Sequence, residues 1–220
     1  MPTTALYWPP QPPAVAPEPE TGLALGCDVS NYTSVRGFAP ISSADLVRRA
    51  REEAGIRFII VQALPTSYPS TDRQCQAVID GGSVLGAYAW LFPGGAYDGD
   101  FLRRLQRLEP YREHLWRLAT DVEDQALTEA EVHEAFTLAK AWLPNSPCMC
   151  YTGKWYLDAM GWTQATFPEV DEWWLSDYDG DPNPDTANLP CAIKQYADEP
   201  PVDWITGVDM NVCYAALLST

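Results

Sequence analysis

From Gly22 onward, short apolar runs alternate along the sequence with amphipathic segments of helical period. An apolar run of about four to eight residues is typical of a buried strand, whereas a period of about 3.6 residues is typical of a helix that packs by one face. The alternation therefore predicts repeated βα units around a parallel sheet. The expected strands are residues 23–28, 57–63, 84–90, 118–123, 147–152, 172–176, 191–196 and 206–210.

Eight strands in this order predict an α/β fold, a TIM-like (β/α) barrel. The helices expected around it are residues 44–54, 72–80, 99–108, Thr128 to about Leu143, 153–160 and 211–218. Two of them carry end signals, because Ser43 precedes the first and Gly55 closes it, while Thr128 and Glu131 have the spacing of a capping box. The later connections are poor in helical pattern, notably from Asp177 to Pro190, so we expect an irregular, helix-poor second half.

The chain divides into an N-terminal arm and one domain. Residues 1–21 are rich in proline, which lacks a backbone N–H and fixes φ, so this segment is predicted to be an extended arm without helix or central strand. Residues 22–220 form the expected barrel domain. The first ten residues have neither the basic start nor the continuous apolar segment of a secretory signal, so we expect synthesis in the cytoplasm without a signal peptide.

The charge of the chain restricts its partners. Asp and Glu number 30 against 14 Lys and Arg, which gives a formal net charge of −16 at pH 7. Such a charge repels the phosphates of nucleic acids and the anionic surfaces of membranes. The apolar runs are also shorter than the roughly 18 residues that a membrane-spanning helix needs. Neither nucleic acid nor membrane is therefore an expected partner.

Residues with metal-binding chemistry lack the spacing of a metal site. Segment 177–185 places Asp or Asn at alternate positions, as calcium loops do, but Pro182 occupies the position that needs glycine, so a solvated turn is expected. His114 and His133 lie in helical patterns without companion ligands. Of the six cysteines, four lie in strand-like runs and are expected to be reduced and buried. No metal site is predicted.

The strongest candidate site is a set of four carboxylates. Asp28, the pair Asp121 and Glu123, and Asp209 end the first, fourth and last expected strands. In a parallel barrel the loops that follow the strands converge on one face, where the reactive groups gather. Each aspartate follows a Gly or Ala by two positions, so the small residue shares its strand face and leaves room near the barrel axis. The four carboxyl groups are therefore predicted to share one pocket.

Paired carboxylates at this spacing indicate glycoside hydrolysis. Residues two apart on a strand are separated by about 6.6 Å, and glycosidases place two carboxyl groups around one sugar linkage. Crowding raises the pKa of at least one group, which keeps it protonated as an acid while another stays charged. Glu123, longer and nearer the loop, is the expected proton donor. Asp121 is the expected electrostatic partner, or the group that orients a reactive acetamide or water, and Asp28 and Asp209 hold the network and the sugar.

The Asp-x-Glu pair is weak support when taken alone, because acidic pairs two residues apart recur elsewhere in the chain. Its position after an apolar run, with matching acids on the first and last strands, carries the interpretation. Aromatic faces stack on sugar rings, so aromatic residues near the strand ends are expected to line the same cleft. The expected substrate-binding residues are Tyr88, Tyr151, Trp174, Tyr178 and Gln195.

Six segments resemble the motifs of one enzyme family, in the same order along the chain. They are Gly26-Cys27-Asp28-Val29-Ser30, Gly86-Ala87-Tyr88, Asp121-Val122-Glu123, Tyr151-Thr152-Gly153-Lys154-Trp155, Trp174-Leu175-Ser176-Asp177-Tyr178, and Gln195-Tyr196 with Gly207-Val208-Asp209-Met210-Asn211. Together they make the region of about 22–214 resemble the glycoside hydrolase family 25 lysozymes, the Chalaropsis-type muramidases of bacteria and phage endolysins.

The resemblance implies an enzyme that cleaves the β-1,4 bond between N-acetylmuramic acid and N-acetylglucosamine in peptidoglycan. Glu123 matches the acid of the family, and Asp28, Asp121 and Asp209 match its supporting acids. The resemblance implies no cofactor.

The chain departs from the family motifs in the residues expected around the sugar. Asn31-Tyr32-Thr33 stands where the family has an aromatic residue and then Gln, and Gln62-Ala63-Leu64 stands where it has Lys-Ala-Thr. Lys194 replaces the Trp that precedes Gln195 in the family motif. The acids are thus retained while the surrounding shell is altered.

Three functional hypotheses follow. The first is a phage-encoded N-acetylmuramidase that binds the peptidoglycan glycan strand and acts at the bacterial cell wall. Because many walls are anionic, a protein with this charge needs a tether, and the arm of residues 1–21 is expected to dock it on another protein, such as a component of a phage virion. The alternative is a virion structural or glycan-binding protein that retains the lysozyme-like fold with little or no catalysis. The third is a cellular muramidase exported by a nonclassical route.

Overall fold

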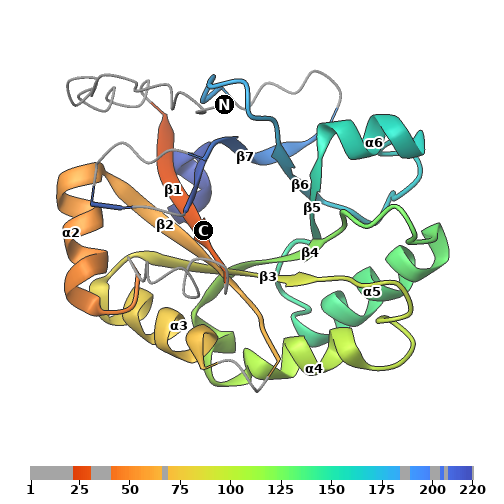
Figure 1. Ribbon diagram of the computed structural model, residues 1–220, viewed down its shortest axis with the longest axis horizontal. Helices are drawn as coiled ribbons and strands as arrows, with labels where there is room; N and C mark the ends of the chain where they lie inside the picture. The colour runs from red at the N-terminus through yellow and green to blue at the C-terminus, as the bar shows by residue number, and fades with distance from the viewer. Residues whose placement is uncertain are drawn as a thin grey trace, which may run out of the picture.

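The computed structural model describes residues 22–30, 41–65, 69–183, 189–198, 204–205 and 208–219. Its eight strands form a closed barrel in the order in which they occur along the chain (Figure 1). The strands are β1 (Leu23–Val29), β2 (Ile56–Gln62), β3 (Val84–Trp90), β4 (Leu115–Asp121), β5 (Met149–Gly153), β6 (Glu172–Ser176), β7 (Cys191–Ala197) and β8 (Asp209–Tyr214). The predicted TIM-like α/β barrel is confirmed, whereas the predicted arm of residues 1–21 lies outside the described residues.

The last strand differs from its prediction in extent and direction. Strands β1 to β7 are parallel to their neighbours, but β8 pairs antiparallel with both β7 and β1. The expected end of this strand at residue 210 and the expected helix over 211–218 are wrong, because the strand continues to Tyr214 and only a short 3-10 helix, η2 (Ala215–Ser219), follows. Residues 206–207 of the expected strand lie outside the described residues. Pairing on both sides satisfies the exposed edges of β1 and β7, which outweighs the helical pattern of this short segment.

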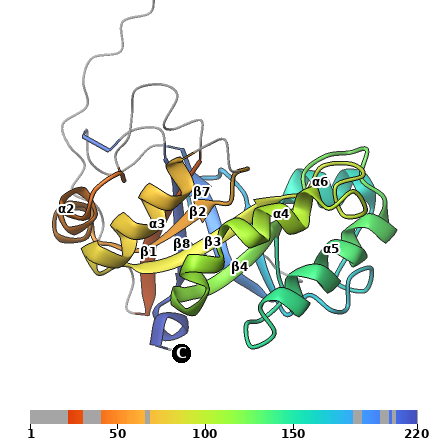
Figure 2. The same cartoon turned by 90° about the horizontal axis from the view of Figure 1, so that it is seen from below.

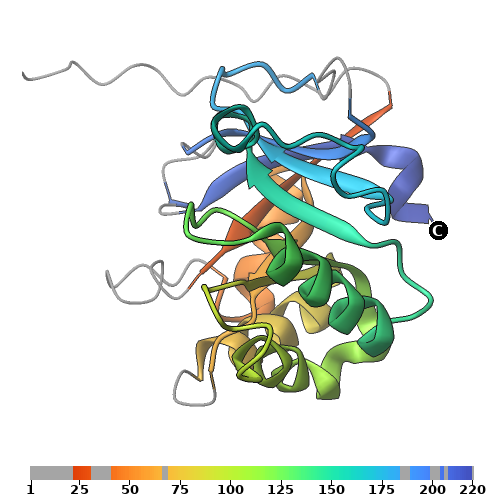
Figure 3. The same ribbon diagram turned by 90° about the vertical axis from the view of Figure 1, so that its right-hand side faces the viewer.

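Helices cover only part of the barrel. They are α2 (Ala44–Ala54), α3 (Ser70–Gly81), α4 (Asp100–Arg107), the 3-10 helix η1 (Glu109–His114), α5 (Glu129–Trp142) and α6 (Lys154–Met160). Figures 1 and 3 show α2 to α5 gathered along the side of the barrel formed by the earlier strands. In the described parts of the chain between Ser176 and Asp209 there is no helix, which confirms the helix-poor second half. No helix among the described residues is long and apolar enough to cross a membrane.

Local signals set the helix ends as predicted. The Ser43 hydroxyl accepts a hydrogen bond from the Leu46 N–H at 3.3 Å, and Gly55 ends α2 with a left-handed φ of 70°. Thr128 and Glu131 form the complete capping box at the start of α5. These bonds satisfy backbone N–H groups that lack partners within the helix, which explains why the two boundaries were readable from sequence.

The buried side chains form two apolar layers. One layer packs between the outside of the barrel and the helices, and the other fills the barrel interior. The interior layer contains Ala24, Phe58, Ile60, Tyr88, Ala119, Met149, Tyr151, Trp174, Ala192, Ile193 and Cys213. Because strand residues alternate between faces, each strand contributes every second side chain to this interior. None of the six cysteines forms a disulfide bond, and five are buried.

The barrel is closed at the end from which most strands start. There Arg117, on β4, donates to both carboxylate oxygens of Glu172, on β6, at 2.7 and 2.9 Å. The adjacent Trp116 donates its indole N–H to the Leu217 carbonyl of η2 at 2.7 Å. Figure 2 shows η2 and the C-terminus at this end. The opposite end, where β1 to β7 finish, remains accessible to ligands.

Candidate active site

The structure brings the four sequence-predicted acids together at the end of the barrel where the parallel strands finish. Asp28 lies near the end of β1, Asp121 is the last residue of β4, and Glu123 follows it by two positions. Asp209 is the first residue of β8 and stands opposite Asp28 in the antiparallel register. All four line one cavity of about 520 Å³.

Asp209 reaches this cavity by a different route from the one predicted. It begins a strand instead of ending one, but β8 runs antiparallel, so its start lies at the same end of the barrel as the ends of the other strands. Beneath Asp209 on the same strand face lies Asn211. Gly207, the small residue predicted there from the sequence, is outside the described residues. Gly26 does keep space below Asp28, because a Cβ there would lie 2.4 Å from the Phe58 ring.

Two amide side chains hold Asp28. Gln195 Nε2 and Asn211 Nδ2 each donate to Asp28 Oδ2 at 2.8 Å. The two amides are themselves oriented by aromatic donors. The hydroxyls of Tyr151 and Tyr178 both donate to Gln195 Oε1 at 2.8 Å, and the Trp174 indole N–H donates to Asn211 Oδ1 at 2.7 Å. We call these six residues together the Asp28 network.

Burial and mutual repulsion raise the pKa of both acids on the paired strands β1 and β8. Burial, followed by the charge of Asp209, raises the pKa of Asp28 to about 8, against the lowering effect of the amide hydrogen bonds. Burial and the charge of Asp198 raise the pKa of Asp209 to about 6, and the hydrogen bond from Tyr178 opposes this. At neutral pH the site therefore retains protons that isolated aspartates would release.

The pair after β4 is perturbed in the same direction. Burial and then the charge of Asp209 raise the pKa of Glu123, which is partly exposed. Burial, Glu123 and Asp28 raise the pKa of Asp121 well above its usual value. Asp121 Oδ1 is buried and has no hydrogen-bond partner among the described residues. General acid catalysis requires one carboxyl group that stays protonated near neutral pH, and neighbouring carboxyl groups with different pKa values can remain ionised beside it.

The predicted aromatic residues divide between wall and mouth. Tyr88, Tyr151 and Trp174 line the cavity but are almost fully buried, and the Tyr151 and Trp174 ring centroids are only 4.3 Å apart. Tyr178 also lines the cavity and is 53% exposed, so its ring is open to a ligand. The fifth predicted contact residue, Gln195, lies between Tyr178 and Asp28.

Sequence reasoning missed several residues of the site. One is Asn211, which donates to Asp28, and the others line the cavity: Ser30, Gln62, Leu64, Trp90, Trp155 and Ser176. The period-two rule that selected the acids also selects Gln62 and Trp90, which end β2 and β3 on the inward faces. The indole N–H of Trp90 is buried without a partner in the described structure. Applying the rule to polar and aromatic residues as well as acids finds both.

The metal-like segments have other roles. No group of three or more His, Cys, Asp or Glu in the described residues is arranged to hold a metal ion. In the loop after β6, Asp179 and Asp181 each accept a hydrogen bond from the backbone N–H two residues ahead, at 2.9 Å. Such bonds are typical of turns. His133 Nδ1 is hydrogen-bonded to the Glu169 side chain near the surface.

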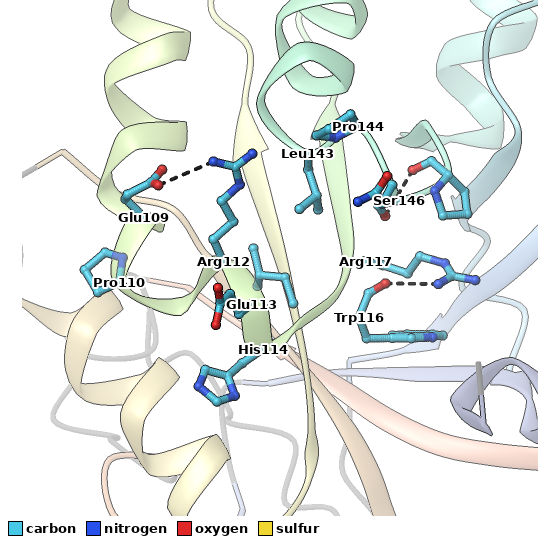
Figure 4. Close-up of a pocket in the computed structure, with 13 residues that line it drawn as sticks. Glu109, Pro110, Arg112, Glu113, His114, Trp116, Arg117, Leu143, Pro144 and Ser146 are labelled. Atoms are coloured by element: carbon cyan, nitrogen blue, oxygen red, sulfur yellow. Dashed lines mark hydrogen bonds and ion pairs between the residues drawn. The ribbon is translucent and has the colours of Figure 1, made fainter.

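A larger hollow, of about 670 Å³, lies at the opposite end of the barrel (Figure 4). It is lined by η1, the start of β4 and residues 143–147. The close-up shows Arg112 extending toward Glu109, and Arg117 beside the backbone of Trp116. None of the four acids lines this hollow, so it is separate from the candidate active site.

Solved structures with the same fold include two endolysins and a glycosyl hydrolase 25. The chain has a TM-score of 0.67 and 16% identity to the catalytic domain of the endolysin ply40 from a Listeria monocytogenes bacteriophage, with 91% of this chain and 97% of that chain covered. For GHIP, a glycosyl hydrolase 25 of Streptococcus pneumoniae, the TM-score is 0.64 and the identity 15%, with 88% of each chain covered. For the CTP1L endolysin the TM-score is 0.56 and the identity 14%, with 89% of this chain and 68% of that chain covered. At these identities the likeness concerns the fold.

The sequence itself assigns the family. Among curated proteins none matches the chain. The family model for glycosyl hydrolases family 25 matches residues 27–204, which includes Asp28, Asp121 and Glu123, whereas Asp209 lies just beyond the match. The match extends over most of the chain, and the barrel with its acid-lined cavity agrees with it. The chain therefore belongs to glycosyl hydrolase family 25 and is a glycoside hydrolase.

Proposed function

We propose that this glycoside hydrolase is a peptidoglycan N-acetylmuramidase, which cleaves the β-1,4 bond between N-acetylmuramic acid and N-acetylglucosamine, and that Glu123 donates the proton. The observation that carries the proposal is the convergence of Asp28, Asp121, Glu123 and Asp209 on one cavity. The family match and the fold shared with endolysins support peptidoglycan as the substrate.

Glu123 has the position and the protonation of a general acid. Glu123 and Asp209 are the partly exposed acids of the cavity, and the longer side chain of Glu123 can approach the glycosidic oxygen of a bound glycan. Its raised pKa keeps it protonated at a higher pH than an ordinary glutamic acid. A proton delivered to the leaving oxygen as the bond breaks stabilises the transition state, and this typically contributes about 10²- to 10⁴-fold to the rate.

The remaining acids act on the other reacting groups. Asp121, which lines the cavity two positions before Glu123, is assigned to the substrate acetamide N–H or to a water. Asp28 is held by Gln195 and Asn211 and therefore forms a fixed wall of the site. Asp209, next to Asp28, adds negative charge where the sugar ring develops positive charge.

The sugar ring is bound by aromatic and amide groups. Tyr178, exposed at the mouth, offers a ring face for stacking, while Gln195 orients Asp28 beneath it. Tyr88, Tyr151 and Trp174 form the buried wall, and their packing fixes where the ring can sit.

The test is hydrolysis of purified peptidoglycan by wild type and Glu123→Gln, measured as new reducing ends and by mass spectrometry of the released fragments. We expect products with N-acetylmuramic acid at the reducing end and a rate reduced about 10²- to 10⁴-fold in the variant. Glu113→Gln is the matched control, because Glu113 is exposed in the hollow at the other end of the barrel. Equal rates for wild type and Glu123→Gln, or no hydrolysis by either, contradict the proposal. Binding of glycans without hydrolysis supports the non-catalytic alternative.

We further propose that the enzyme is phage-encoded and acts at the cell wall from a virion, to which residues 1–21 tether it. The net charge of −16 supports a tether, because it opposes free approach to an anionic wall. Wild type and a variant that lacks residues 2–21 are compared for incorporation into phage particles and for hydrolysis of soluble wall fragments. We expect loss of incorporation with hydrolysis retained; unchanged incorporation contradicts the tether.

A further inference from the structure

Lys194 is a buried cation on β7. Its residue is 3% exposed, and its partners in the barrel register are Leu175 on β6 and Val212 on β8, which are also buried. Moving an ammonium group out of water costs several kcal/mol unless a partner compensates for it. At this position the chain departs from the family motif, which has an apolar tryptophan. The burial of Lys194 therefore requires a specific contact.

That contact is Asp179, in the loop after β6. Lys194 Nζ donates to both carboxylate oxygens of Asp179 at 2.8 Å. Although burial acts in the opposite direction, the hydrogen bonds from Lys194 and from the backbone lower the pKa of Asp179. The pair is therefore an ion pair at neutral pH, and its lysine side is almost completely removed from solvent.

The backbone on either side of Asp179 is fastened to the same strand. The Asp177 N–H donates to the Gln195 carbonyl at 2.9 Å, and the Gly180 N–H donates to the Tyr196 carbonyl at 3.2 Å. Gly180 adopts a φ of 74°, which favours glycine and turns the chain back over β7. The loop thus continues the edge of the sheet above the cavity.

Tyr178, next to Asp179, points the other way. Its hydroxyl donates to Gln195 Oε1 at 2.8 Å, on the cavity side of the loop. Consecutive residues of a strand face opposite sides, so Gln195 faces the barrel interior and Lys194 its outside. Two adjacent residues of β7 therefore contact two adjacent residues of the loop. Gln195 binds Tyr178 on the cavity side, and Lys194 binds Asp179 on the outside of the barrel.

We propose that Lys194 is a positioning residue for the reaction, which, through its ion pair with Asp179, holds Tyr178 over the carboxylates at the mouth of the cavity. The inference rests on the proposed function, because it concerns how the same site is assembled. The Asp179 side chain is 44% exposed, so the loop has no deep apolar anchor at this point, and the ion pair adds to the two backbone hydrogen bonds that fasten the loop to β7. Fixing a side chain that contacts substrate preserves the geometry of the reacting groups.

The kinetic test compares Lys194→Met, which keeps the length of the side chain without its charge, and Asp179→Asn. Each is expected to lower kcat/KM on peptidoglycan about tenfold, since misplacement of a contact residue costs up to about 10²-fold. Asp181→Asn is the control, because it removes the same charge from the same exposed loop at a residue with no lysine partner in the described structure.

The decisive arm repeats Asp179→Asn in a Tyr178→Ala background. If the ion pair acts through Tyr178, its loss has little further effect once that side chain is gone. The same tenfold loss in both backgrounds overturns the proposal, as does a loss of equal size in Asp181→Asn. Thermal melting of every variant identifies any that fail to fold. Because the Asp179 side chain is partly exposed, Asp179→Asn provides the test even if Lys194→Met, at a buried position, does not fold.

A readout without activity separates this proposal from the proposed function. Nuclear magnetic resonance follows the side-chain amide of Gln195 and the exchange rate of the Gly180 backbone N–H. Both are expected to change in Lys194→Met and Asp179→Asn but not in Asp181→Asn. If wild type lacks hydrolytic activity while these signals change, the proposed function fails and the positioning of Tyr178 stands. If neither signal changes, Lys194 does not position Tyr178.

Discussion

The two sides of the barrel are built differently. On the helix-covered side, β2 to β5, helices α2 to α6 pack against or follow the strands. On the helix-free side, β6 to β8, no helix separates the strands in the described residues, and two of the strand pairings are antiparallel. Figure 3 shows the same asymmetry, with α2 to α5 along one flank and the late strands, together with α6 and η2, along the other.

Different forces hold the two sides. On the covered side, helix residues such as Val47 and Val132 are fully buried in the apolar layer outside the barrel. On the helix-free side, polar side chains inside the barrel are tied together by the Asp28 network, with Asn211 0% exposed. Apolar packing is non-directional and tolerates repacking, whereas a buried hydrogen-bond network requires every partner to be in place.

The division extends to the site. The candidate proton donor Glu123 follows β4, on the covered side. The groups that hold Asp28 and fix the mouth come mainly from the helix-free side, through Gln195, Asn211 and Tyr178. The comparison indicates that the regular half of the barrel supplies the reactive acid and the irregular half supplies the polar frame around it.

The largest effect is expected where the two sides are joined. Glu172 on β6 and Arg117 on β4 form a buried bidentate ion pair, with side-chain exposures of 16% and 9%. Removing one partner of a buried pair leaves an uncompensated charge, so Glu172→Ala is expected to lower the free energy of unfolding by about 3–5 kcal/mol, measured by denaturant titration.

Two further variants sharpen that measurement. Asp158→Ala breaks the exposed pair with Lys154 and is expected to cost less than about 1 kcal/mol. The double variant Arg117→Met with Glu172→Leu removes both charges and is expected to recover most of the loss. A cost for Glu172→Ala no larger than that for Asp158→Ala means that the pair does not join the two sides.

A smaller effect is expected within the helix-free side. Asn211→Leu leaves the Trp174 indole N–H and Asp28 Oδ2 each without one hydrogen bond, so we expect a loss of about 1–3 kcal/mol in the free energy of unfolding. It also releases Asp28, so kcat/KM is expected to fall. Val132→Ala, at a fully buried site on α5, is the matched change on the covered side and should cost stability without changing kcat/KM. If Asn211→Leu and Val132→Ala lower kcat/KM equally, the two sides of the barrel do not differ in their contribution to the site.

The sequence predicts the covered side better than the helix-free side because its signals are local. The cap at Ser43, the left-handed Gly55 and the capping box at Thr128 lie within a few residues of the boundaries they set. Strand β8 has no such signal, because its direction and its end at Tyr214 depend on pairing with β1 and β7, which are far away in sequence. A short alternating segment is ambiguous until its partners are known.

The site shows the same limit. Asp28 and Asp121 could be placed because each ends an apolar strand and follows a small residue by two positions. Asn211 was not assigned, because its place beneath Asp209 follows from the antiparallel direction of β8. The contact between Lys194 and Asp179 depends on the path of a loop, which no periodicity encodes.

The smallest expected effect tests whether the two sides are coupled by charge. Asp209, on β8, is one of the groups that raise the pKa of Glu123, after burial. The negative charge of Asp209 opposes the formation of a second negative charge, so Asp209→Asn is expected to lower the pKa of Glu123. Because the proton donor must be protonated, activity in the variant should decline at a lower pH than in wild type, seen as a shift of the alkaline limb of the kcat/KM profile.

Asp198→Asn provides a control whose predicted effect has the opposite sign. Asp198 is exposed, and its charge helps to raise the pKa of Asp209 to about 6, after burial. Without Asp198, Asp209 ionises at a lower pH and opposes the ionisation of Glu123 more fully, so the alkaline limb should stay in place or move to higher pH. If both variants move the limb to lower pH, the shift reflects a general loss of negative charge. If Asp209→Asn alone does so, a carboxylate of the helix-free side sets the working pH of the acid on the covered side.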